Sequence, residues 1–280
     1  MLETQSFRPY PQPRFAISDR VRAAAAQHAP RQNHLLAALA QPDFDRLLPY
    51  LYPVSLPAGW AVHGAGGRER HLYFLTSGIV SRIFILENGA STGFAITGSE
   101  GAIGVASFLG GETVPSQAMV LSAGYAYRLS ADVLAAEFDS FGPLAQILLR
   151  YTQSLITQMM LTAACYRHHS LEQQLCRWIL ACLDRLPGNA LGMTQERIAD
   201  MLGVRREGVA EAAGHLRSAG LIRYGRGHIE TLDRRGLEDR ACECYSAVKR
   251  ECDRLLAEPR PGERPCGGWP HPAISALRNA

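Results

Sequence analysis

The sequence MTQERIADMLGVRREGVAEAAGHLRSA, residues 193–219, predicts a helix-turn-helix. Thr194 suits the N-cap of the first helix, and the helix dipole favours Glu196 in its first turn. Gly203 falls at the turn, where a positive φ is expected. The alternative is a helical hairpin with a solvated charged face. The apolar side chains that we expect in the shared core are Ile198, Ala199, Leu202, Val204, Val209, Ala212 and Leu216.

The second of these helices carries charged residues at its N-terminal end. A recognition helix contacts base edges with this end. An arginine can bind guanine through two acceptors, a glutamate can accept from cytosine, and a helix N-terminus attracts phosphate. We therefore predict DNA contacts at the following residues of the two helices: Thr194, Gln195, Arg205, Arg206, Glu207, Gly208 and Glu211.

Residues 221–232 predict a β-hairpin directly after the second helix. Two short strand-like runs flank Gly225-Arg226-Gly227, so Arg226 is expected at the tip. Such a wing places Arg226 near a phosphate backbone, and we include His228 in the predicted DNA contacts. A helix-turn-helix followed by a wing with an arginine at its tip is more specific for DNA binding than the helix-turn-helix alone.

The region between Val54 and Leu129 is predicted to be rich in β-strands. Short apolar or alternating runs are separated by glycines, and Asn88-Gly89 is typical of a tight hairpin turn. Many short strands at roughly even spacing favour a sandwich or barrel, here a jelly-roll-like β-roll. Before this region, Asn33 suits the N-cap of a short helix.

A long helix is predicted from Pro143, which suits the first turn of a helix. Arg150 is the only charged residue between Pro143 and Tyr166. Because a helix on the surface of one domain normally has a charged outer face, we expect burial on two sides, the second by another subunit. The alternative is a central helix within a monomer. The predicted dimer interface consists of Leu144, Leu148, Tyr151, Leu155, Met159 and Tyr166.

These patterns together predict an α+β fold in three parts. A β-roll sensor domain covers residues 31–142, a dimerisation helix covers 143–169, and a winged helix-turn-helix domain covers 170–256. In the third part, Ser170 and Gln173 suit a capping box, and one final helix is expected from about Asp233. Residues 1–30 and 257–280 contain many prolines and are predicted to be a disordered arm and tail.

The composition excludes several classes of protein. The chain has 280 residues, a formal net charge of +3, 47% hydrophobic and 20% charged residues, which excludes collagen-like and wholly disordered chains. We find no secretory signal and no apolar run long enough to span a membrane, so we expect a cytoplasmic protein without membrane contact. Lys249 is the only lysine among 29 basic residues, and arginine suits bidentate contacts with phosphate and guanine.

The seven cysteines lie in the second half of the chain and are expected to be reduced thiols. Cys242 and Cys244 resemble half of a metal site. On a helix, residues two apart point about 200° away from each other, so one ion cannot easily bind both. The alternative is a metal or redox site in which Cys252 joins one of them. His168 and His169 are expected to end the long helix as a polar hinge that caps it, and the alternative is that they bind a metal. The cysteines predicted to be core residues are Cys165, Cys176 and Cys182.

The chain resembles the Crp/Fnr family of bacterial transcription regulators over about residues 33–256. Residues 193–207 are similar to the family's leading helix, turn and recognition helix, and residues 72–78 follow the rhythm of its β-roll. The resemblance implies an effector-sensing β-roll, and homodimers that bind double-stranded DNA and act with RNA polymerase. It also implies that Arg206 and Glu207 read bases. Glu211 stands where the family often has a further arginine, so the target sequence need not be the usual one.

The resemblance also indicates how the β-roll differs from a cyclic-nucleotide site. Family members that bind cyclic nucleotides hold the phosphate with a Gly-Glu pair and an Arg-Ser pair. The corresponding residues here are Gly104, Val105, Ser116 and Gln117, so the main charge-assisted contacts are missing. We therefore expect an effector pocket at these four residues that takes an unidentified small molecule and does not bind cyclic AMP in the standard way.

We expect no cofactor and no metal. The absence of a cysteine before Cys165 argues against an iron–sulfur cluster near the sensor. A single histidine such as His63 or His71 is more typical of a structural or surface residue than of a haem ligand. A phosphate site shifted towards Glu112 remains an open alternative.

We predict a homodimeric, sequence-specific regulator of transcription that is not an enzyme. The sequence has no nucleophile elbow, P-loop or dinucleotide fingerprint. The alternative is a cupin-like metal-dependent enzyme, or a small-molecule-binding module without DNA binding. His63 and Glu100 would be a minimal ligand set for that enzyme, which would leave the winged helix without a role.

Overall fold

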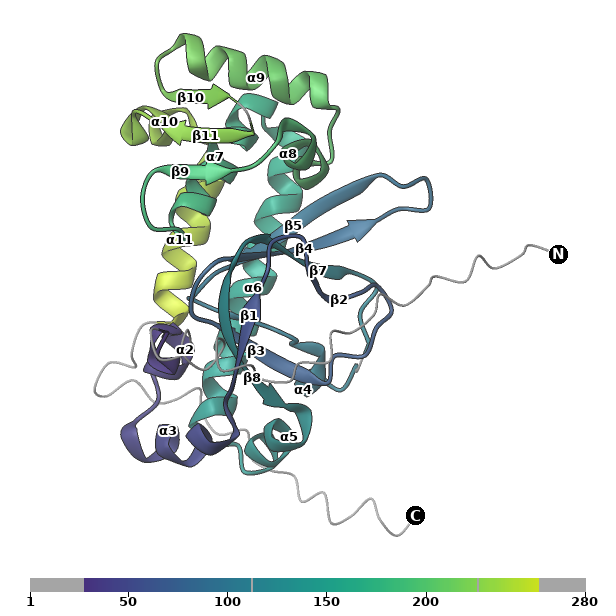
Figure 1. Cartoon of the computed structure of the whole chain (residues 1–280), viewed down its shortest axis with the longest axis vertical. Coiled ribbons are helices and arrows are strands. Elements are labelled where there is room, and N and C mark those ends of the chain that lie inside the picture. Colours follow the sequence, from purple (N-terminus) through teal and green to yellow (C-terminus); the bar gives the residue numbers. More distant parts are fainter. Residues whose placement is uncertain (1–27, 112, 226, 257–280) are drawn as a thin grey trace, which may run out of the picture.

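The computed structural model describes residues 28–111, 113–225 and 227–256 (Figure 1). The predicted tail 257–280 and most of the predicted arm 1–30 lie outside these residues. The described chain forms a β-roll, a long helix and a smaller part with helices and a three-stranded sheet, which confirms the predicted α+β class. No helix in the described ranges is long and apolar enough to cross a membrane.

Two four-stranded antiparallel sheets form the roll, with strand orders β1-β8-β3-β6 and β2-β7-β4-β5. Val54, Leu75, Val80 and Val120 are among the buried apolar side chains between the sheets. Asn88 Oδ1 accepts a hydrogen bond from the backbone nitrogen of Ala90 (3.0 Å), which confirms the hairpin turn between β4 and β5. The strands are β1 Tyr52–Leu56, β2 Ala61–His63, β3 His71–Leu75, β4 Ile79–Ile85, β5 Ser91–Thr97, β6 Ala102–Ile103, β7 Gln117–Ser122 and β8 Gly124–Ser130.

Short helices cover one end of the roll. Asn33 caps α2 as predicted, because its side chain accepts from the backbone nitrogens of Leu35 and Leu36. Its Nδ2 also donates to the carbonyl oxygens of Leu75 and Gly101, each at 2.8 Å, and so fixes this helix to the roll. The helices are η1 Pro30–Gln32, α2 His34–Ala37, α3 Gln41–Leu47, η2 Leu48–Tyr50, α4 Ala106–Leu109 and α5 Ala131–Asp139.

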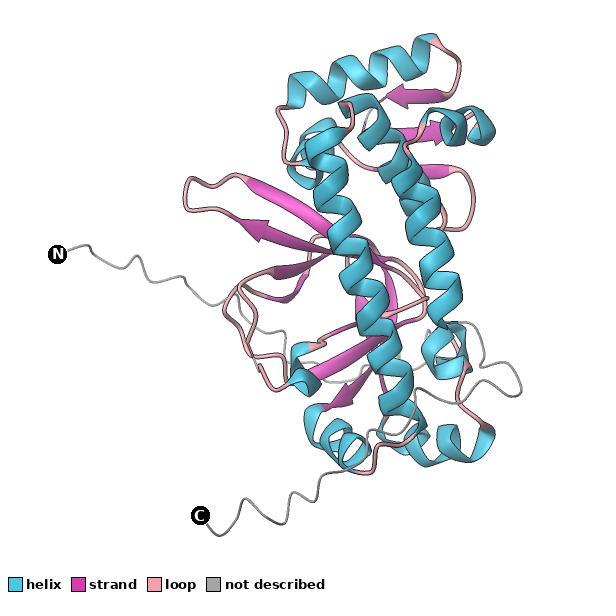
Figure 2. Ribbon diagram, turned by 180° about the vertical axis from the view of Figure 1, so that it is seen from behind, coloured by secondary structure: helices cyan, strands magenta, loops and turns pink. Residues whose placement is uncertain are grey.

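The long helix α6 spans Pro143–His168 and runs along the roll (Figure 2). Leu144, Leu148 and Tyr151 are buried in the same core as residues of β3 and β8. The Tyr151 hydroxyl donates to the carbonyl oxygen of Ala102 (2.8 Å) and lies 3.3 Å from Thr97 Oγ1. One face of α6 is therefore held by the roll of its own chain.

The C-terminal part contains the helix-turn-helix. Helix α7 Leu171–Leu183 begins with the predicted capping box of Ser170 and Gln173. The expected hairpin is present, and it forms a three-stranded sheet with order β10-β11-β9 because an unpredicted strand joins it. The other elements are β9 Ala190–Gly192, α8 Gln195–Leu202, α9 Arg206–Ser218, β10 Ile222–Gly225, β11 His228–Thr231, α10 Arg234–Arg240 and α11 Glu243–Leu256.

The prediction of a single final helix from about Asp233 is wrong. The chain forms two helices, α10 and α11, because Ala241 is extended (φ −69°, ψ 154°) and ends the first of them. Helix α10 packs on α7, whereas α11 turns away and packs along α6. Figure 2 shows α6 and α11 as two long neighbouring helices.

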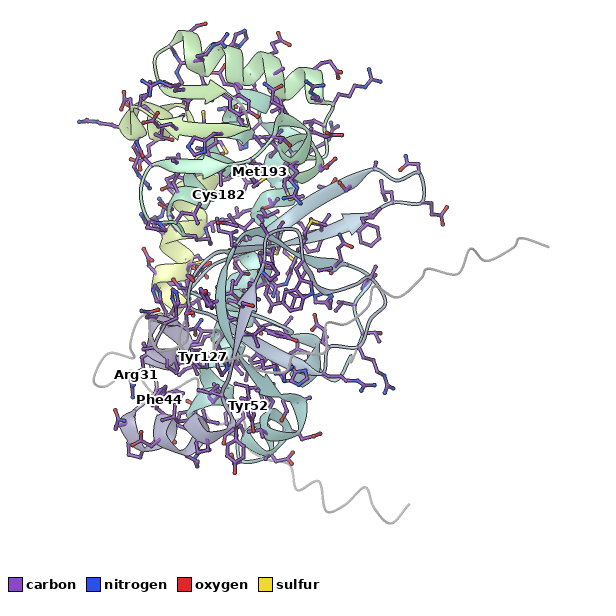
Figure 3. The ribbon with its side chains drawn as sticks, viewed as in Figure 1. Arg31, Phe44, Tyr52, Tyr127, Cys182 and Met193 are labelled. Carbon is purple, nitrogen blue, oxygen red and sulfur yellow. The ribbon has the colours of Figure 1, made fainter. Side chains whose placement is uncertain are left out.

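A shared apolar core joins the roll to the C-terminal part. Ile83 and Ile96 of the roll belong to the same buried cluster as Trp178 of α7 and Leu202 of α8. Cys182 and Met193, labelled in Figure 3, are also members of this cluster. The two parts of the chain therefore lie against each other with apolar side chains buried between them.

Candidate nucleic-acid interface

The helix-turn-helix geometry agrees with the sequence in detail. Thr194 Oγ1 accepts from the backbone nitrogen of Arg197 (3.3 Å), which confirms the N-cap of α8. Gly203 ends α8 in the left-handed region at φ 67°. A side chain there would be strained, and its Cβ would lie only 2.4 Å from Thr92 Oγ1. Ile198, Leu202 and other predicted core residues are buried.

The N-terminal end of α9 presents most of the predicted contact residues to solvent. Arg205, Arg206, Glu207 and Glu211 are exposed, and among the described residues none of them forms an ion pair. Gly208 is half-buried and faces α7 instead, because a Cβ there would lie 2.8 Å from Leu171 Cδ2. The structure therefore groups the four charged side chains and gives Gly208 a packing role.

The wing lies beside the start of α8. A Cβ on Gly227 would lie 3.4 Å from Thr194 Cγ2, so the two segments are in contact. His228 is exposed on β11 and pairs with Gly225 of β10. Arg226 lies outside the described residues. Figure 1 shows α9 and the wing at the end of the molecule farthest from α3 and α5.

The β4–β5 hairpin of the roll contacts the helix-turn-helix directly. Ser91 Oγ donates to the carbonyl oxygen of Asp200 (3.3 Å). The hydroxyl of Tyr166 on α6 lies 2.7 Å from the carbonyl oxygen of Gly93 and 2.9 Å from that of Met201. One side chain of the long helix thus contacts both the roll and α8.

One of the four predicted effector residues lines a cavity in the roll. Gly104 lines a cavity of about 510 Å³ in the roll together with His63, Glu69 and His71, whereas Val105, Ser116 and Gln117 are not among its lining residues. Gly104 has φ +110°, and a Cβ there would lie 2.2 Å from the carbonyl oxygen of His71. Gly104 is therefore the one predicted effector residue among those that line this cavity, and the four-residue pocket stays a prediction.

A glutamate of the chain itself lies in the cavity beside Gly104. Glu69 is 8% exposed, and its carboxylate accepts from the backbone nitrogen of Ala106 (2.7 Å) and pairs with His63 Nε2 (2.8 Å). Burial raises the pKa of Glu69, but the hydrogen bond and charge of His63, the hydrogen bond from Ala106 and the charge of Arg82 outweigh burial and lower the pKa below its usual value. Glu69 is not among the residues predicted from the sequence, since nothing local in the sequence places its carboxylate at Ala106.

A second cavity of about 480 Å³ lies between the roll, α6, α7 and α11. Its lining includes Glu100 of the roll and Arg185, which pair at 2.7 Å from Oε1 to Nε. His63 and Glu100 therefore have different partners, and the minimal ligand set of a cupin-like enzyme is not assembled. The volume of this cavity is in the range of small-molecule sites.

The predicted dimer interface is largely buried within one chain. Leu144, Leu148, Tyr151 and Leu155 are each at most 4% exposed, and the first three pack on the roll of the same chain. The hydroxyl of Tyr166 contacts the carbonyl oxygens of Gly93 and Met201 in the same chain. The opposite side of α6 carries an exposed outer row, spaced alternately four and three residues apart: Leu149, Gln153, Ile156, Met160, Ala163 and Arg167.

Comparisons with known proteins agree with this architecture. A model of the Crp-like helix-turn-helix domain matches residues 173–240, and a model of the cyclic nucleotide-binding domain matches residues 53–141. A search of curated proteins finds no match.

Solved structures share the fold. A putative transcriptional regulator of the Crp/Fnr family from Eubacterium rectale has a TM-score of 0.59 and 17% identity, covering 74% of this chain and 96% of that one. FixK2 from Bradyrhizobium japonicum has a TM-score of 0.57 and 18% identity, covering 69% of this chain and 98% of that one.

A β-roll of the cyclic-nucleotide-binding type joined to a Crp-like helix-turn-helix defines a class of DNA-binding transcription regulators. The two domain models together match more than half of the chain, and the chain belongs to the Crp/Fnr family. The members of this family are transcription regulators and not enzymes.

Proposed function

We propose that this protein binds a pseudo-palindromic operator as a homodimer and regulates transcription in response to a small molecule other than cyclic AMP. The observation that carries the proposal is the exposed N-terminal end of α9. Arg205, Arg206, Glu207 and Glu211 gather there, and among the described residues none of them is occupied by an ion pair. Side chains of this kind at this position suit the reading of base edges in a major groove.

The homodimer that we propose uses the outer row of α6. Leu149, Ile156 and Met160 are 39%, 46% and 60% exposed, which is unusual for large apolar side chains on one helix face. Their spacing of seven and four residues is that of a coiled-coil seam. Two copies of α6 packed along this row would relate two α9 helices by a twofold axis, as half-sites about one helical turn apart require.

The same proposal gives each of the three parts of the chain its own role. Residues 31–142 would sense the signal, 143–169 would form the dimer, and 170–256 would bind DNA through Thr194, Gln195, His228 and the exposed residues of α9. The small molecule would contact the roll in one of its two cavities. RNA polymerase is the further partner that we expect for a regulator of this class.

The test begins with selection of bound DNA from a random pool, followed by gel-shift titrations at fixed salt. We expect Arg206→Ala to weaken specific binding by about 1–3 kcal/mol, roughly 5- to 150-fold, and to relax specificity at one base pair. Arg217→Ala is the matched control, because Arg217 is exposed in the last turn of the same helix. Unchanged specific binding by Arg206→Ala would contradict the assignment of α9 as the recognition helix.

A further inference from the structure

Three cysteines and one histidine converge where α6 ends and α11 begins. The Sγ atoms of Cys165, Cys242 and Cys244 and a ring nitrogen of His169 all lie within 4.8 Å of one another. The Sγ atoms of Cys165 and Cys242 are 3.5 Å apart, and Cys244 Sγ lies 3.7 Å from His169 Nδ1. All three cysteines are at most 4% exposed.

Two segments far apart in the sequence build this cluster. Cys165 and His169 are four residues apart at the C-terminal end of α6, so they share one side of the helix. Cys242 precedes α11, and Cys244 lies in the first turn of that helix. The expectation that Cys242 and Cys244 cannot approach one ion is wrong, because it assumed a continuous helix and the chain is not helical at Cys242.

The distances fit a single tetrahedral ion. Zinc binds thiolate sulfur at about 2.3 Å and imidazole nitrogen at about 2.0–2.1 Å. In a tetrahedron these bond lengths separate two sulfurs by about 3.8 Å and a sulfur from a nitrogen by about 3.6 Å. The distances of 3.5 Å and 3.7 Å in the cluster are close to these values.

The surroundings of His169 are those of a metal ligand. Its Nδ1 faces Cys244, while its Nε2 lies 3.3 Å from Glu243 Oε2. A histidine that binds a metal commonly donates its other ring N–H to a carboxylate, which fixes the orientation of the ring. Glu243 lies between the two cysteines in the sequence. Residues 242–244 therefore supply two of the four ligands and the carboxylate that orients His169.

Arg177 is a buried cation beside the cluster. This arginine is 7% exposed, its Nε has no hydrogen-bond partner, and it forms no ion pair among the described residues. It lies close enough to Cys165 and Cys244 to interact electrostatically with both. A buried cation requires a compensating charge. Three thiolates, a neutral imidazole and one Zn²⁺ carry a net charge of −1, which would supply it.

We propose that Cys165, His169, Cys242 and Cys244 bind one zinc ion. Three sulfur ligands favour zinc over magnesium and calcium, and four protein ligands close the site, so its role is structural. Binding releases the thiol protons to solvent. The ion would connect the end of the long helix to the start of α11, which lies beyond the residues matched by the helix-turn-helix domain model.

The first experiment measures zinc in the full-length chain, purified without chelators, by inductively coupled plasma mass spectrometry. We expect about one zinc per chain in the wild type and a loss of most of it in Cys242→Ser. Cys252→Ser is the matched control, because Cys252 is a cysteine of α11 outside the cluster and should leave zinc content unchanged. Equal loss of zinc in both variants would overturn the assignment.

A second measurement does not depend on the folding of a variant. Cobalt(II) added to metal-stripped wild-type chain should give the visible and near-ultraviolet bands of a tetrahedral thiolate site, and zinc should displace it. Glu243→Gln should weaken zinc binding by about 10- to 100-fold without removing it. Absence of both zinc and the cobalt bands, or a disulfide between Cys165 and Cys242 in their place, would refute the site. DNA binding is measured separately, so the two proposals can fail independently.

Discussion

Glu69 sets the charge of the cavity beside Gly104. Its carboxylate accepts a hydrogen bond from the backbone N–H of Ala106 and pairs with His63 Nε2. An anion bound in the cavity would have to displace this carboxylate or lie next to its negative charge. Because the pKa of Glu69 is lowered, this carboxylate stays ionised at neutral pH. A buried carboxylate repels a phosphate placed next to it. In addition, the backbone N–H of Ala106 already donates to Glu69 and is not free to bind the phosphate.

We therefore expect no micromolar binding of cyclic AMP or cyclic GMP to the wild-type chain. Isothermal titration calorimetry and thermal shift at neutral pH would measure it. Glu69→Gln removes the charge and keeps the shape of the side chain, and serves to show whether the charge is the cause. Micromolar affinity of the wild type for either nucleotide would show that Glu69 does not exclude a cyclic phosphate from the cavity.

Residues whose role depends on the local chain could be predicted from the sequence. The caps at Asn33, Ser170 and Thr194 and the left-handed turn at Gly203 follow from local hydrogen-bonding and backbone preferences. The contacts of Glu69 with Ala106 and of Cys242 with Cys165 could not, because these partners are 37 and 77 residues apart in the sequence. Residue type alone does not determine such partners.

Helix α6 shows how an element can have two apolar faces with different partners. The inner face, with Leu148 and Tyr151, packs on the roll, and the outer row with Ile156 and Met160 is exposed. The sequence predicted burial on two sides, but a helical stripe does not say which side faces which partner. The assignment of the inner face to the dimer was wrong for this reason.

The outer row gives a prediction at the scale of the helix. Ile156→Glu combined with Met160→Glu should convert a dimer to a monomer, because each apolar side chain buried at an interface contributes about 1.5–3 kcal/mol and the charges repel across a twofold axis. Analytical ultracentrifugation measures the change. Leu109→Glu is the control, since Leu109 is 51% exposed on α4 and does not belong to the outer row. A dimer that survives the double substitution would exclude the outer row as its interface.

At the scale of the whole molecule, the roll and the DNA-binding part are joined by a common core. Ile83 and Ile96 pack in one cluster with Trp178 and Leu202, and Tyr166 contacts the backbone of both parts. The sequence predicted the parts because each has its own local pattern. It did not predict how they meet, since apolar side chains on a hairpin and a helix have many ways to pack.

We expect Tyr166→Phe to loosen this connection while leaving each part folded. The substitution removes the one hydroxyl proton that the carbonyl oxygens of Gly93 and Met201 share, and a hydrogen bond of this kind is worth about 0.5–1.5 kcal/mol. Hydrogen exchange at β5 and at the end of α8 should become faster. Tyr224→Phe is the matched control, because the Tyr224 hydroxyl donates to the carbonyl oxygen of Met193 (3.3 Å), which lies within the same DNA-binding part. Equal exchange at β5 in the wild type and Tyr166→Phe would contradict the connection.

The return of α11 along α6 has a mechanical consequence. A body that is attached at one point can turn about any of three axes, whereas a body attached at two points turns only about the line that joins them. The DNA-binding part is attached through the junction of α6 and α7, and again through the segment between α10 and α11 that follows Arg240. Together with the apolar core between the parts, these two attachments leave α9 less freedom to turn relative to the roll than a single attachment would.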